Sequence, residues 1–342
     1  MKDAAWLAWI EQLAVAPACR DQGNTLPRSL FHCLLDDQPD HLVPARLLQP
    51  ERWEGLSDRP FFLNPECIFT REGKADADAF AFGNQSEIAQ GNIVWVRDPG
   101  SETLQPFWVS GELLNVLAGA QPGDPAPSSI RSQACRRLTM ANILVPEGFI
   151  SRRHRRWNEI VSFVRPQFRS RGYAAVGDLI HPFHIAALRR YYRRQLRTGK
   201  LRLGDGQSPL RYISYNDPVC QFFHHQLTAA MSGFAGEPLK PSYVYLASYQ
   251  AGAVLEKHTD REQCDFSVTF CLDYAPEPRN ATPWPLLLHT KSGTVKVFQA
   301  IGDALLYRGY QLPHSRDKLA AGHNSTSIFF HYVKEDFAGS LG

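Results

Sequence analysis

The chain lacks the features of a membrane or secreted protein. No run of 18 or more apolar residues occurs among its 342 residues, so we expect no membrane-spanning helix. Its seven cysteines are scattered without a C-x-x-C pair, and its first residues lack the basic-then-apolar order of a secretion signal. These absences predict reduced thiols and a cytoplasmic protein without a membrane partner.

Residues 1–130 also lack any recognisable catalytic motif. They are rich in proline and acidic side chains, with apolar runs at 93–96 and 107–109 that predict strands. The stretch 121–129 (QPGDPAPSS) has the composition of a linker or an exposed loop. We therefore predict an N-terminal accessory domain over residues 1–130, which serves recognition or packing.

Charge is strongly segregated along the chain. Residues 1–130 carry 9 basic and 18 acidic side chains, whereas residues 131–200 carry 16 basic and 3 acidic ones. Two interpretations stay open: these arginines are solvated or paired with the acidic N-terminal part, or they form a surface for an anionic partner. Apolar residues at helical spacing predict helices at 182–198 and 219–234. We assign residues 131–239 to a basic helical segment that supports the C-terminal domain.

Short apolar runs follow one another closely from residue 240 onward. Proline, glycine and serine separate them, a spacing typical of a sandwich or barrel rather than a βαβ fold. The expected strands are 242–249, 254–257, 266–272, 284–289, 294–299, 304–307, a segment at His314, and 327–333. The sequence thus predicts an α+β protein with a strand-rich core at 240–342.

Three residues of this core form a candidate metal site. His258 and Asp260 follow a predicted strand as an H-x-D triplet, and His314 comes 54 residues after Asp260. Two imidazoles and one carboxylate can occupy one face of an octahedral iron and leave the opposite face open. H-x-D alone is common by chance, so the surrounding pattern decides. The other histidines are expected to be ordinary core or surface residues.

The surrounding pattern resembles a known family. Tyr249-x-x-Gly252-x-x-Leu255-x-x-His258-x-Asp260, then Gly302-Asp303-Ala304-Leu305-Leu306-Tyr307, then His314 resembles the Fe(II)/2-oxoglutarate-dependent oxygenases, and most closely their prolyl-hydroxylase-like branch. The resemblance covers about residues 240–335. It implies a double-stranded β-helix, or jelly roll, flanked by helices.

The resemblance also implies an activity. The three residues His258, Asp260 and His314 would be both the Fe(II) ligands and the catalytic centre of a dioxygenase. Such enzymes hydroxylate an unactivated C–H bond while 2-oxoglutarate is converted to succinate and carbon dioxide, and ascorbate is a further cofactor to consider. The intact carboxylate of Asp260 favours hydroxylation over halogenation, because halogenases of the family replace it with a small residue.

One departure from the family concerns the cosubstrate. The family has an Arg or Lys about 9–11 residues after the distal histidine, and this chain has His323, Asn324 and Ser325 there. A guanidinium is the natural bidentate partner of a carboxylate. We expect Arg316 to take this role, because it lies two residues beyond His314 and so on the same strand face.

Further cosubstrate contacts are expected from neighbouring strands. Arg308 and Arg261 are the next candidates for the anchor, and His323 or Ser325 could add hydrogen bonds. Tyr249 and Tyr307 are either core residues or groups that line the pocket and bind the cosubstrate.

Three classes of function follow. The favoured one is hydroxylation of an amino-acid side chain, free or within a peptide or protein, and an acidic substrate would suit the basic segment. The second is a nucleic-acid-modifying oxygenase that uses the arginines on backbone phosphates. The third is a catalytically silent binding module that retains the fold.

Overall fold

The protein divides into two compact units, which are described separately. The computed structural model describes residues 31, 33–35, 42–44, 47, 60–70, 92–117, 119–126 and 132–341. One unit comprises residues 17–160 and 181–187, and the other comprises residues 1–16, 161–180 and 188–342. Much of the predicted accessory domain and part of the stretch 121–129 lie outside the described residues. The predicted domain boundaries at residues 130 and 239 therefore stay predictions.

The first unit is built on a small antiparallel sheet. Its strands are β2 (Cys67–Thr70), β3 (Ile93–Arg97) and β4 (Leu104–Trp108), paired in that order. The two predicted strands are confirmed, and their apolar residues, such as the cross-strand partners Val94 and Phe107, are buried. The unit also holds β1 (Phe61–Leu63) paired with β5 (Leu144–Pro146), and helices α2 (Gly111–Leu117) and α3 (Ser132–Met140).

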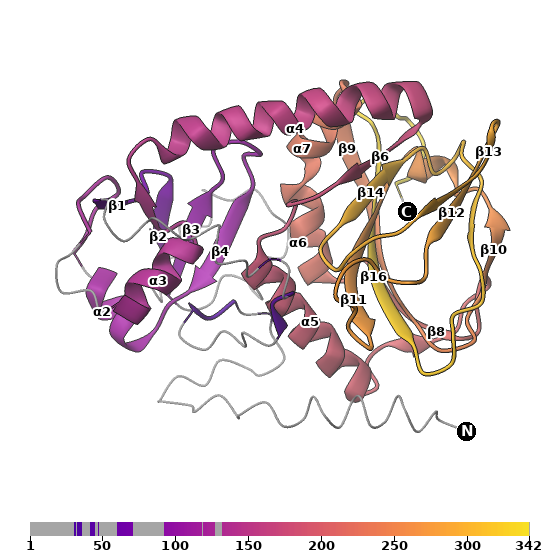
Figure 1. The fold of residues 1–342 in the computed structure, drawn as a ribbon, viewed down its shortest axis with the longest axis horizontal. Coiled ribbons are helices and arrows are strands. Elements are labelled where there is room, and N and C mark those ends of the chain that lie inside the picture. Colours follow the sequence, from indigo (N-terminus) through magenta and orange to yellow (C-terminus); the bar gives the residue numbers. More distant parts are fainter. Residues whose placement is uncertain are drawn as a thin grey trace. The chain divides into compact units, whose positions relative to one another are not determined.

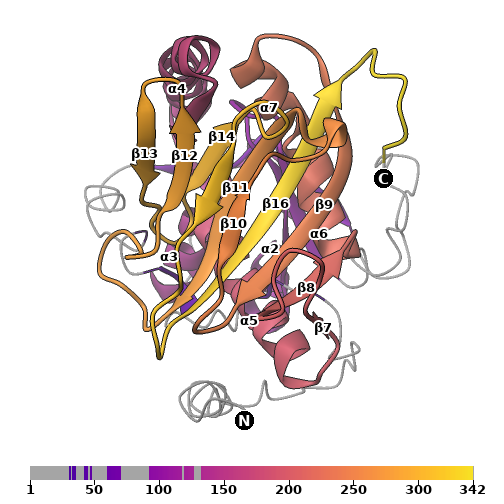
Figure 2. The ribbon, with the colours of Figure 1, turned by 90° about the vertical axis from the view of Figure 1, so that its right-hand side faces the viewer.

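The second unit contains two antiparallel sheets (Figures 1 and 2). The large sheet has the order β6-β14-β11-β16-β9-β8-β7 and the small sheet the order β10-β15-β12-β13. Their bounds are β6 (Tyr173–Val176), β7 (Arg202–Leu203), β8 (Arg211–Tyr215), β9 (Leu239–Tyr249), β10 (Leu255–His258), β11 (Phe266–Ala275), β12 (Leu286–Thr290), β13 (Gly293–Val297), β14 (Ala304–Tyr307), β15 (His314–Arg316) and β16 (Asn324–Lys334).

The strand order identifies a double-stranded β-helix. From β9 to β16 the chain passes back and forth between the sheets, with β9, β11, β14 and β16 in the large sheet and β10, β12, β13 and β15 in the small one. This alternation is how a jelly roll closes two sheets over one core. The predicted α+β class and jelly roll are confirmed.

Helices pack against the outer face of the large sheet. His224 of α6 (Pro218–Gln226) packs its ring against Tyr332 and Phe330, at centroid distances of 4.6 and 5.8 Å. Because side chains alternate along a strand, His331 of β16 points to the opposite, inner face. A second helix, α7 (Thr228–Ala235), follows α6 directly, so the single helix predicted at 219–234 is broken at Leu227.

Two longer helices carry most of the arginines of residues 131–200. α5 (Pro182–Arg197) matches the predicted helix, whereas the 23-residue α4 (Phe149–Arg171) was not expected from its arginine-rich sequence and internal Pro166. Arg189 and Arg193 of α5 are paired with the buried Asp273 of β11 instead of lying in solvent. No helix in the described part of the chain is long and apolar enough to cross a membrane.

Candidate metal centre

Strand pairing brings the two histidines of the candidate triad together. In the small sheet β10 runs antiparallel to β15, and His258 and His314 are direct partners in the register. Side chains of such a pair project from the same face about 4.5–5.5 Å apart at Cβ. Their ring centroids are 4.4 Å apart, so strand pairing brings together two histidines that are 56 residues apart in the sequence.

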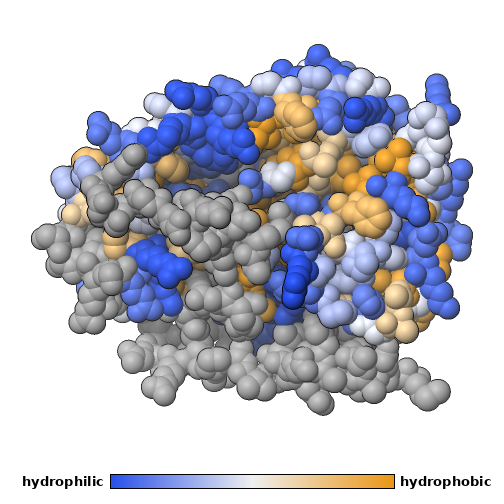
Figure 3. All heavy atoms as spheres, viewed as in Figure 1, coloured by the Kyte–Doolittle hydropathy of each residue, from blue (hydrophilic) through white to orange (hydrophobic). Residues whose placement is uncertain are grey.

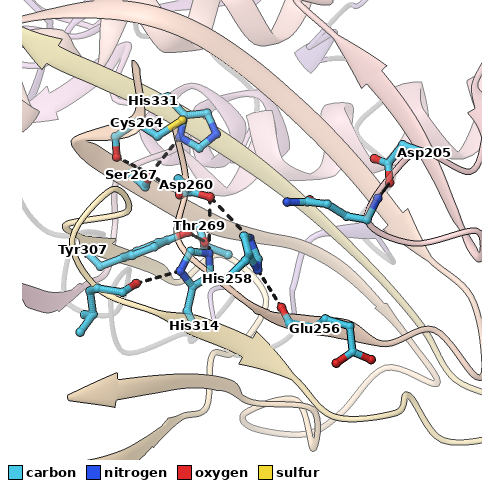
Figure 4. Close-up of polar contacts among 12 residues, drawn as sticks. Asp205, Glu256, His258, Asp260, Cys264, Ser267, Thr269, Tyr307, His314 and His331 are labelled. Carbon is cyan, nitrogen blue, oxygen red and sulfur yellow. Dashed lines mark hydrogen bonds and ion pairs between the residues drawn. The ribbon is translucent and has the colours of Figure 1, made fainter. Parts of the chain in front are cut away.

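Asp260 completes the cluster from the loop after β10. Its Oδ1 lies 3.6 Å from Nε2 of His258 and 3.6 Å from Nε2 of His314. Ligand atoms of the three residues all lie within 4.8 Å of one another, and Figure 4 shows the three side chains pointing to a common centre. A cation placed between them would meet two neutral nitrogens and one carboxylate oxygen, which is the donor set of a facial triad.

Both imidazoles are oriented through their second ring nitrogen. Nδ1 of His258 lies 2.8 Å from the carbonyl oxygen of Glu256, and Nδ1 of His314 lies 3.0 Å from that of Leu312. A carbonyl only accepts, so each Nδ1 carries the hydrogen and each Nε2 presents a lone pair toward Asp260. This arrangement of a ligating histidine with a backbone acceptor fixes both tautomer and ring orientation.

Electrostatics keep the carboxylate charged. Burial raises the pKa of Asp260, but its contact with His258 and the neighbouring imidazoles outweighs burial and brings the pKa to about 2. Burial lowers the pKa of His258, but the contact with Asp260 outweighs it, and the pKa is raised. Burial lowers the pKa of His314, the more enclosed of the two rings. The cluster is therefore an anion facing two imidazoles that can be neutral.

Asp260 also touches a second group of polar residues, which sequence reasoning did not single out. Ser267 donates a hydrogen bond from Oγ to Asp260 Oδ2 over 3.0 Å, and Nδ1 of His331 lies 2.9 Å from the same Oγ. Cys264 and His331 lie close enough to Asp260 to form another three-residue cluster. Burial and the charge of Asp260 raise the pKa of the Cys264 thiol to about 12, which keeps it protonated and a poor metal ligand.

Arg316 is buried beside the triad. It is two residues from His314 on β15, on the same face, whereas Ser315 between them points the other way and bonds His289. Its Nη1 donates to the carbonyl of Trp284 over 2.7 Å, and its guanidinium lies over the Trp284 ring. Its Nε is buried without a hydrogen-bond partner, and no carboxylate of the described residues pairs with this arginine.

The two tyrosines named from the sequence are also buried near the triad. The ring of Tyr307 packs edge-on against His314 at 5.0 Å, and its hydroxyl faces Thr269. Tyr249 packs against Trp284 at 5.1 Å, and its hydroxyl accepts a hydrogen bond from Arg211 over 2.8 Å. Both hydroxyls therefore lie on the inner face of the large sheet, on the side of the metal cluster.

The other basic candidates are engaged or exposed. Arg308 forms ion pairs with Asp265 at 3.0 Å and Glu237 at 3.4 Å, and lies over the Phe266 ring, so its charge is already neutralised. Arg261 is exposed in the loop after Asp260. His323 contacts the hydroxyl of Tyr274. Among the predicted anchors, only Arg316 combines burial with an unpartnered guanidinium nitrogen.

Several solved structures are similar to about half of this chain. No protein-family model matches the chain, and no curated protein matches it. A prolyl-4-hydroxylase from Pseudomonas putida is similar in structure, with 18% identity and a TM-score of 0.41, over 51% of this chain and 99% of that one. HygX from Streptomyces hygroscopicus, solved with nickel and 2-oxoglutarate, has 14% identity and a TM-score of 0.40, over 52% of this chain and 87% of that one.

A third similar structure contains a peptide. It is a prolyl hydroxylase from Trichoplax adhaerens in complex with a hypoxia inducible factor oxygen degradation domain peptide fragment. Identity is 12% and the TM-score 0.41, over 51% of this chain and 89% of that one. The strand order described above is a double-stranded β-helix, which is the fold that the resemblance in the sequence implied, so the expectation is confirmed at the level of fold.

Proposed function

We propose that the chain is an Fe(II)- and 2-oxoglutarate-dependent dioxygenase that hydroxylates an unactivated C–H bond. The observation that carries the proposal is the convergence of His258, Asp260 and His314, with both Nε2 atoms directed at the carboxylate by backbone acceptors on Nδ1. This donor set suits a divalent iron and occupies one face of its coordination sphere. When bound, the metal and its cosubstrate supply the dioxygen chemistry that none of these side chains can perform alone.

The residues present also fit 2-oxoglutarate. Burying a guanidinium without an anionic partner is costly, and burial lowers the pKa of Arg316. A bound carboxylate would supply the missing charge and an acceptor for the orphaned Nε. We assign Arg316 as the carboxylate anchor, with Tyr249 and Tyr307 lining the same site. Arg308 is left out of this site because of its two ion pairs.

Space for a substrate is indicated on the inner face of the large sheet. Phe329 stands in the middle of the long strand β16, between Thr269 and Tyr245 on the adjacent strands. Its outward neighbour Phe330 is fully buried, whereas Phe329 is partly exposed although the sheet is covered from outside. Solvent therefore reaches the inner face between the sheets, where a substrate could approach the metal cluster.

The lining of this space favours a substrate with an apolar part. The ring of Tyr245 lies 6.2 Å from that of Phe329 and 6.5 Å from that of Tyr215, which is 46% exposed. Aromatic walls with a few polar groups are typical of small-molecule and side-chain pockets.

Arg211 gives no reason to expect an acidic substrate, because Asp205 already neutralises it. We propose an amino-acid side chain, free or in a peptide or protein, in a cytoplasmic setting with ascorbate as an optional reductant.

A nucleic-acid substrate remains the second candidate, because part of the basic segment is exposed. Arg152, Arg155 and Arg156 lie on the exposed side of α4, where Figure 3 shows hydrophilic side chains gathered. Other arginines are used internally: Arg153 pairs with Asp98 at 2.6 Å, and Arg165 donates to the carbonyl of Gly233. Duplex and single-stranded DNA binding that weakens steeply with salt would support this candidate, and no binding at low salt would remove it.

One experiment separates the enzyme from a silent binding module. Purified protein is loaded anaerobically with Fe(II), and bound iron and the formation of succinate from 2-oxoglutarate are measured with and without candidate substrates. We expect bound iron and succinate in the wild type and neither in His258→Ala. The matched control is His289→Ala, whose ring bonds Ser315 on the other side of the sheet. Absence of both iron binding and succinate formation in the wild type would contradict the proposal.

A further inference from the structure

We infer that Ser267 is a positioning residue that restrains Asp260 to a single metal-facing oxygen. The inference rests on the proposed function, since it assumes that the triad binds a metal ion. It concerns the oxygen of Asp260 that faces away from the histidines. Figure 4 shows Ser267, Cys264 and His331 on that far side of the carboxylate.

The two oxygens of Asp260 have separate partners. Oδ1 lies 3.6 Å from each histidine Nε2, whereas Oδ2 accepts a hydrogen bond from Ser267 over 3.0 Å. A carboxylate that is free on both oxygens can bind a metal through one or both of them. Here the second oxygen is held by a hydroxyl, which favours binding of the metal through Oδ1 alone.

The direction of the serine hydrogen bond follows from its neighbours. Ser267 Oγ has one hydrogen and two acceptors in reach, namely Asp260 Oδ2 at 3.0 Å and the carbonyl of Cys264 at 3.2 Å. His331 Nδ1, at 2.9 Å, donates to the hydroxyl oxygen when it carries the ring hydrogen. The carboxylate is ionised and nearer than the Cys264 carbonyl, so it accepts the hydrogen bond from the hydroxyl. The result is a chain of donors from His331 through Ser267 to Asp260.

The backbone of Asp260 is fixed as well, next to a glycine. The amide of Asp260 donates to the carbonyl of Gly309 over 2.9 Å. A β-carbon on Gly309 would overlap both Asp260 Oδ2 and Ser267 Oγ and would lie only 2.7 Å from the carbonyl of Cys264. The backbone of Gly309 therefore packs closely against Oδ2 and the Ser267 hydroxyl, with no room for a side chain between them. Limiting Asp260 to one bond keeps three positions open for a bidentate 2-oxo acid and dioxygen.

The test uses Co(II), whose visible absorption reports both affinity and coordination number without any turnover. Ser267→Ala is expected to weaken Co(II) binding about 10–100-fold, as for other outer-shell partners of metal ligands, and to change the absorption spectrum. Ser267→Cys keeps a weak hydrogen-bond donor, so its Co(II) affinity is expected to lie between those of the wild type and Ser267→Ala. The matched control is Ser315→Ala, which removes a hydroxyl bonded to His289 on the opposite face of β15. This control is expected to have the Co(II) affinity and the absorption spectrum of the wild type.

A second variant separates a positioning role from general packing. His331→Leu should weaken Co(II) binding in the wild type but add little in the Ser267→Ala background, because both act through one hydrogen-bond chain. Additive effects of the two substitutions, or a Ser267→Ala protein with wild-type affinity and spectrum, would overturn the inference. If the wild type itself binds no Co(II), the proposed function fails instead.

Discussion

His258 and His314 are direct partners across β10 and β15, and their Nε2 atoms lie at equal distances of 3.6 Å from one oxygen of Asp260. The pair therefore forms on a rigid sheet, and only Asp260 comes from a loop. A metal site whose nitrogen ligands are fixed by register is preorganised, so changes in the loop and in neighbouring side chains should tune affinity without dismantling the fold.

The orphaned guanidinium of Arg316 predicts a specific defect. Arg316→Ala should raise the 2-oxoglutarate concentration needed for half-saturation about 10–100-fold, since charge-assisted hydrogen bonds contribute about 1.5–3 kcal/mol. Fe(II) binding should be retained, because the arginine does not touch the three ligands. The comparison variant is Arg308→Ala, whose guanidinium is bound to Asp265 and Glu237. Equal 2-oxoglutarate requirements in wild type and Arg316→Ala would refute the anchor.

Metal affinity should depend on pH through His258. The pKa of this imidazole is raised in the metal-free protein, where burial is outweighed by Asp260, so the proton is held more tightly than in a free histidine. Metal binding needs the neutral ring and must displace that proton, while Asp260, with a pKa of about 2, stays ionised. As pH falls through the raised pKa of His258, the apparent Kd for Co(II) should therefore increase, approaching about tenfold per pH unit.

The measurement is a Co(II) titration at pH 7.5, 6.5 and 5.5 with a fold check by circular dichroism at each pH. His289→Ala should follow the wild type, because that ring lies outside the cluster. An affinity that does not change over this range would show that no proton is released on binding, contrary to the expected role of His258.

Gly309 should be required for metal binding because it has no side chain. Gly309→Ala places a methyl group against Asp260 Oδ2 and Ser267 Oγ, so the carboxylate must shift from its position. We expect weaker Co(II) binding, by about 10-fold or more, as for other disturbances of a ligand's support. Gly177→Ala is a suitable control, since a β-carbon there meets no atom within 4 Å. Unchanged metal affinity in Gly309→Ala would contradict the tight packing around the carboxylate.

The buried carboxylate of Asp273 should be important for stability. It accepts from Arg189 at 3.0 Å and from Arg193 at 2.5 Å, and all three side chains have little exposure. Asp273→Asn leaves two guanidinium groups without that charge and is expected to lower the free energy of unfolding by about 3–5 kcal/mol. Glu277→Gln alters a partner that is 37% exposed and should cost less than about 1 kcal/mol. Urea unfolding of both variants gives the comparison, and equal losses would argue against a special role for the buried pair.

The strand-rich core could be predicted because its signal is local. β9, β11 and β16 are rich in apolar and aromatic residues and are bounded by turn residues, and the sequence predicts them with ends a few residues short. The helices of the basic segment are harder to predict from the sequence. Arginines dominate α4, so its sequence has no clear apolar periodicity. It also contains Pro166, and a proline inside a helix is normally unfavourable.

The sequence by itself determined which three residues are the candidate ligands, because an H-x-D triplet and a distant histidine in a family-like pattern depend only on residue identity and spacing. Tertiary structure alone decided which polar groups surround it. Ser267 and His331 have no distinctive sequence context, yet sheet register places them behind Asp260. The same is true of the arginines, because a guanidinium is equally basic in any sequence. Only folding decides that Arg308 meets two carboxylates while Arg316 is buried with an unpartnered nitrogen.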